Sequence, residues 1–236
     1  TIVEKYSKKD QGVPKKTEGV QRNTESKTLT VDGGSYVAKI NNIAGGSIVS
    51  FDLKKHLKSS EESLNLIDNQ NSKNLVVSFI NQSGEIVVLD ELWSIVSGGS
   101  AVLSEENSAS SMVFETSYMG KPITKKLTFY YNSYEVDVDV SLREIKESSL
   151  DEKYVLSWVG GLPEHEGSQD AMFMESLVSQ AGSIESFRVG AAGFFGSSNT
   201  KNIDEESKKY VGLVDFAGYR TKYFGVFFVP EKSDIV

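Results

Sequence analysis

The residues best able to do chemistry surround one of the two histidines of this chain. His165 stands in the run Pro163-Glu164-His165-Glu166, and Asp170 follows closely. A histidine beside carboxylates could act as a general base or a metal ligand, because the carboxylates raise its basicity. Neighbouring residues of an extended loop point in different directions, however, so these side chains are not expected to converge. The favoured interpretation is a solvated acidic loop.

A second candidate consists of three carboxylates at every second position, Glu135, Asp137 and Asp139. Oxygen clusters can bind calcium, but such sites usually recruit loop carbonyls that a straight strand does not offer. A solvated strand face paired with Lys126 is the favoured interpretation. The other histidine, His56, follows a lysine pair at a predicted strand end and is interpreted as exposed.

Sequence motifs for catalysis and cofactor binding are absent from the chain. It has no cysteine, which excludes disulfides and thiolate metal sites. It also lacks GxGxxG, GxxxxGK[ST], GxSxG and HExxH. Glycine pairs at 33–34, 45–46, 98–99 and 160–161 stand at strand ends, where turns or bulges need them. We therefore predict a binding or structural module with no catalytic residue, no cofactor and no metal; its binding residues are unknown.

Composition limits the class of protein further. The 236 residues are 39% hydrophobic and 25% charged, as in ordinary soluble globular proteins. The net charge of −8 argues against nucleic acid as a partner. No apolar run reaches the roughly 18–20 residues of a membrane span, and residues 1–27 contain no signal peptide. Because the chain does not begin with Met, we expect a mature product or a fragment, and favour a fragment.

The elements that must position these residues are predicted to be strands. A hairpin is predicted from 28–32, a Gly33-Gly34 turn and 35–43. Further strands are predicted at 47–55, 75–80, 86–89, 93–96, 101–104, 112–118, 153–160, 171–178, 183–189 and 191–195, of which 171–178 could instead be helical. Loops are predicted at 56–74, 144–152, 164–170 and 199–209. This short strand spacing is typical of sandwiches.

The clearest strand pattern lies in residues 121–143. Tyr134, Val136, Val138, Val140 and Leu142 alternate with Glu135, Asp137, Asp139, Ser141 and Arg143. A turn at Asn132-Ser133 places Tyr131 opposite Tyr134, Phe129 opposite Val136, Leu127 opposite Val138 and Lys126 opposite Asp139. Every apolar residue then meets an apolar one, which predicts an antiparallel hairpin with one buried and one solvated face.

The densest aromatic and β-branched run extends from Tyr210 to Pro230. It predicts two strands, 210–216 and 223–229, joined by a polar connection at 218–222. Pro230 cannot donate to a sheet and marks the strand end. A pair this apolar is expected at the centre of the core.

Three separated stretches now carry a resemblance. They are 36–40 with Gly45-Gly46 and 47–56, then Trp158–Leu162, then 211–212 with 222–230. In this order they resemble the large periplasmic domain of the bacterial YidC membrane protein insertases. That family has a GG-I-x-x-x-x-L-K-K-Y turn and strand, a W-x-G-G-L element and a closing W-V-G…K-Y-F…I-P pair. This chain departs from the pattern at His56 and Tyr210, and 216–221 lengthens the last turn.

The resemblance implies an all-β fold with little helix, a single large antiparallel β-supersandwich like that of galactose mutarotase. Residues 28–230 would form the periplasmic domain, with residues 1–27, of local net charge +3, as a polar basic linker. Residues 231–236 would lead into a membrane segment, and another would precede Thr1. The implied role is non-catalytic assistance to membrane protein insertion at the periplasmic face of the inner membrane. The implied partners are Sec translocon accessory proteins and nascent membrane-protein substrates.

Two other hypotheses remain open. The same architecture hosts aldose epimerases, so the chain could instead be a carbohydrate-binding or epimerase-like protein. Such an enzyme needs a histidine and a carboxylate that converge in a cleft, and His165 is the candidate. A surface adhesion or scaffold sandwich is the third hypothesis.

Overall fold

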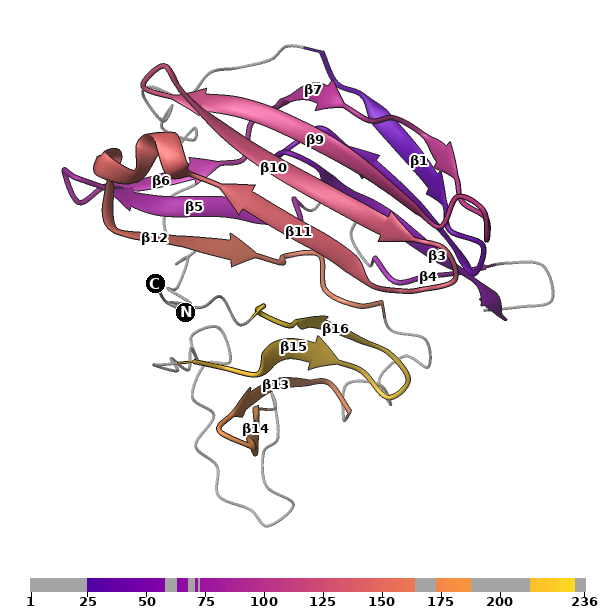
Figure 1. The fold of residues 1–236 in the computed structure, drawn as a ribbon. Helices are drawn as coiled ribbons and strands as arrows, with labels where there is room; N and C mark the ends of the chain where they lie inside the picture. The colour runs from indigo at the N-terminus through magenta and orange to yellow at the C-terminus, as the bar shows by residue number, and fades with distance from the viewer. Residues whose placement is uncertain are drawn as a thin grey trace. The chain divides into compact units, whose positions relative to one another are not determined.

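A computed structural model describes residues 25–57, 63–67, 71, 73–163, 173–187 and 213–231 (Figure 1). The described residues divide into two compact units at the Gly161–Leu162 bond. The first unit is described from residue 25 to Gly161, and the second from Leu162 onward. Each is treated by itself below.

The described residues of the first unit form three sheets. One has the order β4-β3-β2-β1-β8 and consists of β4 (Ser63–Asn65), β3 (Ser47–Leu57), β2 (Tyr36–Asn41), β1 (Thr28–Asp32) and β8 (Ala101–Val102). The second, β11-β10-β9-β7, consists of β11 (Val136–Ser141), β10 (Lys121–Tyr130), β9 (Ala109–Tyr118) and β7 (Ser94–Ser97). The third, β12-β5-β6, consists of β12 (Ser149–Ser157), β5 (Val76–Asn81) and β6 (Ile86–Leu89). All pairs are antiparallel except β1 with β8.

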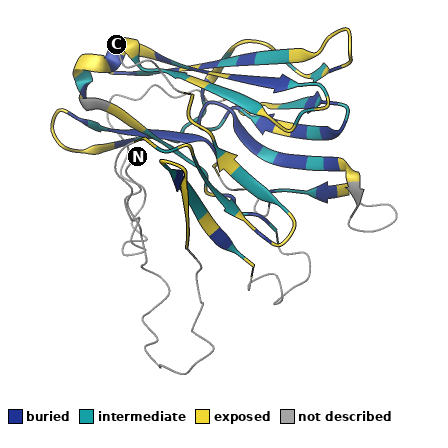
Figure 2. Ribbon diagram, turned by 60° about the horizontal axis from the view of Figure 1, so that its bottom comes forward, coloured by how far each residue is buried: buried dark blue, intermediate teal, exposed yellow. Residues whose placement is uncertain are grey.

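The core of the first unit is built from the inward residues of these strands. Figure 2 shows buried residues alternating with intermediate and exposed ones along several strands. The fully buried large side chains include Trp93, Tyr36, Phe114, Phe129, Ile123 and Leu127. The rings of Tyr36 and Phe51 stack at 4.6 Å between centroids, across the β2–β3 pair. Burial of these side chains is the main force that stabilises the unit.

The hairpin predicted in 121–143 is confirmed as β10 and β11. Phe129 pairs with Val136, Leu127 with Val138 and Lys126 with Asp139, in the predicted register. The connection is longer than predicted, because Tyr131 and Asn132 form the turn and β11 begins only at Val136. The predicted turn at 45–46 is also confirmed, and β1, β2, β3, β5 and β6 lie where strands are predicted.

Gly45 and Gly46 cannot carry side chains for two reasons. Both have positive φ, +70° and +101°, where a Cβ is strained. A Cβ on Gly45 would lie 2.6 Å from the ring of Trp93, and one on Gly46 would lie 2.6 Å from the ring of Phe114. The glycine pair therefore admits two large core side chains against the backbone of the turn.

Two predicted loops are wrong in part. In place of the loop predicted at 144–152, the chain forms a 3-10 helix, η1 (Arg143–Ser148), and then enters β12 directly. Ile145 is fully buried, and its burial draws this charged segment onto the unit. The predicted loop 56–74 contains β4, which pairs with β3 and buries Leu64.

The side chain of Gln82 fixes η1 to the β5–β6 turn by donating to the carbonyls of Glu147, at 3.1 Å, and Ser149, at 3.0 Å. We expect Gln82→Ala to lower the free energy of unfolding by about 1–2 kcal/mol, because both carbonyls lose a partner near the surface. Urea unfolding measures this loss. If Gln82→Glu, which keeps the side-chain length but loses the amide donor, is as stable as the wild type, the stabilisation lies in packing instead.

The second unit contains one sheet of order β14-β13-β15-β16. Its strands are β14 (Ser183–Phe187), β13 (Glu175–Gln180), β15 (Phe216–Arg220) and β16 (Gly225–Phe228). The predicted strand at 210–216 is wrong for residues 213–215, which precede β15, and right only for Phe216 among its described residues. The predicted connection at 218–222 is mostly β15, and the turn is 221–224, closed by the bond from Thr221 N to Phe224 O.

Part of β15 lies in the stretch predicted as a polar connection, and aromatic packing against β16 stabilises it in the sheet. A Cβ on Gly218 would lie 2.4 Å from the ring of Phe227, so that ring covers the glycine of the neighbouring strand. The expectation that this pair forms the centre of the core is wrong. β16 is an edge strand, and the large fully buried side chains belong to the first unit.

The all-β prediction is confirmed for the described residues, in which small antiparallel sheets dominate and helix is almost absent. The residues predicted at 191–195 and 199–209 lie outside the described part of the chain. No helix of the described residues is long and apolar enough to cross a membrane.

Candidate functional site

A lysine lies at the centre of the first unit. Lys125 is fully buried on β10, between the inward residues Ile123 and Leu127. Its Nζ donates to the carbonyl oxygens of Ala44 and Leu75, each at 2.5 Å. The same Nζ lies 5.5 Å from the centroid of the Trp93 ring. We call Lys125, Asn42 and Asn74, with the backbone groups they bind, the polar core cluster.

Among the described residues, no carboxylate forms an ion pair with Lys125, whose Nζ donates to backbone carbonyls instead. Burial lowers the pKa of Lys125 to about 7, because a charged amine loses hydration in the core. The two carbonyl dipoles and the Trp93 ring compensate part of this loss. The amine therefore changes its charge close to neutral pH.

Both carbonyl partners of Lys125 belong to residues in a strained backbone conformation. Ala44 has φ +53° and Leu75 has φ +58°, in the left-handed region. This conformation costs an L-residue about 1–2 kcal/mol. The bonds from Lys125 satisfy the carbonyls of both residues in the core, which helps to maintain the two turns.

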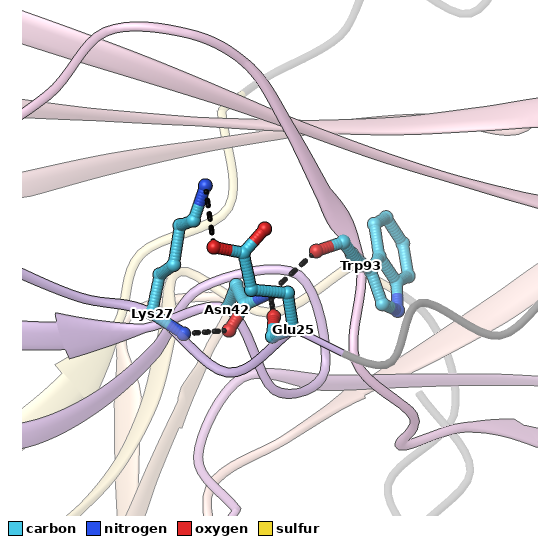
Figure 3. Close-up of polar contacts among 4 residues, drawn as sticks. All are labelled: Glu25, Lys27, Asn42 and Trp93. Atoms are coloured by element: carbon cyan, nitrogen blue, oxygen red, sulfur yellow. Dashed lines mark hydrogen bonds and ion pairs between the residues drawn. The ribbon is translucent and has the colours of Figure 1, made fainter.

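Asn42 holds the chain ahead of β1 (Figure 3). Its Nδ2 donates to the carbonyl of Trp93 at 2.7 Å and to that of Glu25 at 2.9 Å. Its Oδ1 accepts from the backbone N–H of Lys27 at 2.8 Å. An ion pair of 3.2 Å between Lys27 and Glu25 adds to the contact. We call Asn42 and residues 25–27 the N-terminal anchor.

Asn74 holds the chain at the other end of the unit. Its Oδ1 accepts from the backbone N–H groups of Val159, at 3.1 Å, and Gly160, at 2.7 Å. Its Nδ2 donates to the carbonyl of Ile48 at 3.0 Å. A Cβ on Gly160 would lie 2.7 Å from Nδ2, so only glycine allows this approach. We call Asn74, Val159 and Gly160 the C-terminal anchor.

The residues singled out from the sequence are not brought together by the described structure. Glu164, His165, Glu166 and Asp170 lie outside the described residues. His56 lies in β3. Asp139 pairs across the ladder with Lys126, as predicted. Among the described residues, no group of three or more histidines or carboxylates could hold a metal ion.

Asp137, on the same acidic face, accepts a short hydrogen bond from the hydroxyl of Tyr130. This bond to the neutral phenol, together with burial, raises the pKa of Tyr130 to about 12. We expect Asp137→Asn to return the Tyr130 pKa towards its ordinary value of about 10. An NMR titration of the tyrosine ring carbons measures it. Asp139→Asn serves as the control, and an equal fall in that variant would contradict the role of the hydrogen bond.

Sequence reasoning missed the polar core cluster. The signal for Lys125 was the alternation itself, because Ile123, Lys125, Leu127 and Phe129 share one strand face. No comparable signal marks Asn42 and Asn74, whose partners lie far away in the sequence.

Comparison with known proteins gives a consistent result. A family model described as the YidC periplasmic domain matches residues 28–235. A membrane protein insertase YidC of Prosthecochloris aestuarii is 28% identical over 216 residues, which cover 89% of this chain and 35% of that protein. Proteins of the same name from Chlorobaculum tepidum and Chlorobaculum parvum are 26% and 25% identical and are covered to 34%. The chain thus spans about a third of the length of these relatives. No solved structure was found to match it.

Proposed function

This chain belongs to the YidC periplasmic domain family, and we propose that it assists the insertion and folding of inner-membrane proteins as a non-catalytic domain of an insertase. The observation that carries the proposal is the family match over residues 28–235. The relatives extend well beyond the part that this chain covers. Because the domain is proposed to be non-catalytic, the role proposed for these residues is contact with other proteins.

The proposed partners are Sec translocon accessory proteins and nascent membrane-protein substrates. Residues 28–230 would act as the periplasmic domain, and residues 1–27, with their excess of lysine and arginine, as a basic linker. The finer fold that we propose is a galactose mutarotase-like β-supersandwich. Its support is the predominance of antiparallel sheet and the presence of the family's glycine motifs at 45–46 and 160–161.

Site-specific photo-crosslinking in a full-length insertase that contains this domain tests the proposal. Suitable positions are the exposed residues Val102, Met119 and Leu213, which are 74%, 66% and 82% exposed. We expect crosslinks to nascent membrane proteins or to Sec accessory proteins from at least one position. The buried Leu127 is the control position and should give none. The proposal is wrong if no exposed position crosslinks and deletion of 28–230 leaves insertion unchanged.

A further inference from the structure

We propose that Lys125 couples the N-terminal and C-terminal anchors of the first unit, so that loosening one anchor loosens the other. The coupling is a property of the fold and goes beyond the proposed function. It links the residues that precede β1 to the residues that end the first unit. Its basis is one amine that bonds to both turns from which the anchors project.

On the N-terminal side, the link is the short turn that contains both Asn42 and Ala44. Asn42 holds residues 25–27 through its side chain, and Ala44 accepts from Lys125 through its carbonyl. The turn is fixed at both residues, because Trp93 N donates to Asn42 O and Ala44 N donates to Glu91 O, each at 2.8 Å. A shift of Asn42 therefore also displaces the Ala44 carbonyl.

On the C-terminal side, the link is the peptide bond between Asn74 and Leu75. Asn74 holds Val159 and Gly160, and the next residue, Leu75, accepts from Lys125. Leu75 has φ +58°, and its conformation is sensitive to the loss of a partner for its carbonyl. If the Asn74 side chain is released, the orientation of the Leu75 carbonyl is released with it.

Lys125 can transmit these changes because both of its acceptors lie in the core. A buried amine that loses one acceptor cannot replace it with water, so it moves and weakens its bond to the other. A second link also joins the two turns, since Asn74 N donates to Ser47 Oγ at 2.6 Å. The experiment must therefore separate the contribution of Lys125 from that of Ser47.

Native-state hydrogen exchange provides the measurement, on a protein with the full 236-residue sequence. The reporter amides are Lys27, which donates to Asn42, and Val159 and Gly160, which donate to Asn74. Asn42→Ser is expected to speed exchange at Val159 and Gly160 by about fivefold or more, the lower range of coupling between sites. Asn74→Ser is expected to speed exchange at Lys27 by a similar factor, because coupling is reciprocal.

In a Lys125→Met background these cross-effects should disappear, while each variant still speeds exchange at its own anchor. Asn81→Ser is the matched control: the Asn81 Oδ1 accepts from Ser83 and Glu85 of its own hairpin. In Asn81→Ser the hydrogen-exchange rate of the Lys27 amide should change by no more than the loss of global stability requires. Lys125→Gln, which retains an amide donor, replaces Lys125→Met if the methionine variant does not fold.

Ser47→Ala removes the second link without any change at Lys125. Cross-effects that vanish in Ser47→Ala overturn the coupling through Lys125. Cross-effects that persist there and disappear in the Lys125 variants support it, because the bond from Asn74 to the Ile48 carbonyl is present in both. The proposal is also overturned if the protein with Lys125 shows no cross-effects. It fails equally if the cross-effects are unchanged in the Lys125 variants.

Discussion

Asn74→Ala is expected to lower the free energy of unfolding of the first unit by about 3–5 kcal/mol, because it leaves buried backbone groups without partners. The variant removes the acceptor for Val159 N–H and Gly160 N–H and the donor to the Ile48 carbonyl. Val159 is exposed, but Gly160, Ile48 and Asn74 are buried, so water cannot replace the bonds to Gly160 and Ile48 without opening the unit. The loss should exceed that of an ordinary hydrogen-bond deletion.

Urea unfolding followed by tryptophan fluorescence measures this loss, since both tryptophans, Trp93 and Trp158, lie in the first unit. The midpoint should fall while the slope with urea stays constant. Asn81→Ala is the comparison variant, because Asn81 stands at the other end of β5 and its Oδ1 accepts from the backbone N–H groups of Ser83 and Glu85, which are exposed. Its loss should be smaller than that of Asn74→Ala, because solvent reaches these two N–H groups. Equal losses in the two variants would contradict the special role of Asn74.

The second large effect is a dependence of stability on pH that originates at Lys125. Its pKa lies at about 7 in the folded chain, against an ordinary value of 10.5. Between these values the unfolded chain binds a proton that the folded chain does not, so stability rises with pH. Below about pH 7 both states carry the proton, and this group contributes no slope. We expect a gain of about 2–4 kcal/mol between pH 7 and 10.

The upper limit of this pH window is set by tyrosines, since the pKa of Tyr130 is raised to about 12 as well as that of Tyr36. Burial raises the pKa of Tyr36 to about 12, so above its ordinary value of 10.0 the folded chain retains a proton that the unfolded chain loses. Stability contributed by Tyr36 therefore falls above about pH 10. The gain from Lys125 is expected to be visible below that point.

Denaturant unfolding at several pH values tests the effect of Lys125. In Lys125→Met the rise in stability between about pH 7 and 10 should be lost, because no group with that pKa remains. Lys126→Met is the matched control, since Lys126 is the exposed neighbour on the opposite strand face, paired with Asp139. The slope should persist in that variant. Equal slopes in the wild type and in Lys125→Met would refute the assignment.

The β10–β11 hairpin could be predicted from the sequence because its information is local. Apolar and polar residues alternate, the turn is short, and a slip of one residue would expose the apolar face. The pairs Leu127 with Val138 and Lys126 with Asp139 follow directly from that pattern. The glycine pair at 45–46 could likewise be predicted as a turn, but not the rings of Trp93 and Phe114 that it admits.

The segment from Tyr210 to Pro230 could not be predicted in the same way. Its apolar residues form nearly continuous runs, so periodicity does not fix where a strand begins. The partner that defines β15 is β13, and Phe216 pairs with Ser179. Such a distant partner leaves no trace in the local pattern, so the pattern predicts the start of the strand several residues too early.

The polar core cluster was hidden for a related reason. A lysine in an alternating strand is ordinarily read as a solvated residue, because burial of an unpaired charge is costly. The partners that make its burial possible are backbone carbonyls 81 and 50 positions earlier in the chain. Backbone acceptors have no sequence signature, so residue types could not reveal this site.

The most direct test of this account is the titration of Lys125 itself. An NMR titration of its Cε and Nζ signals, assigned by comparison with Lys125→Met, measures the pKa in the folded chain. The buried geometry predicts a value of about 7. A value near the ordinary 10.5 would show that the amine reaches solvent or a carboxylate, and would contradict the polar core cluster on which the two anchors depend.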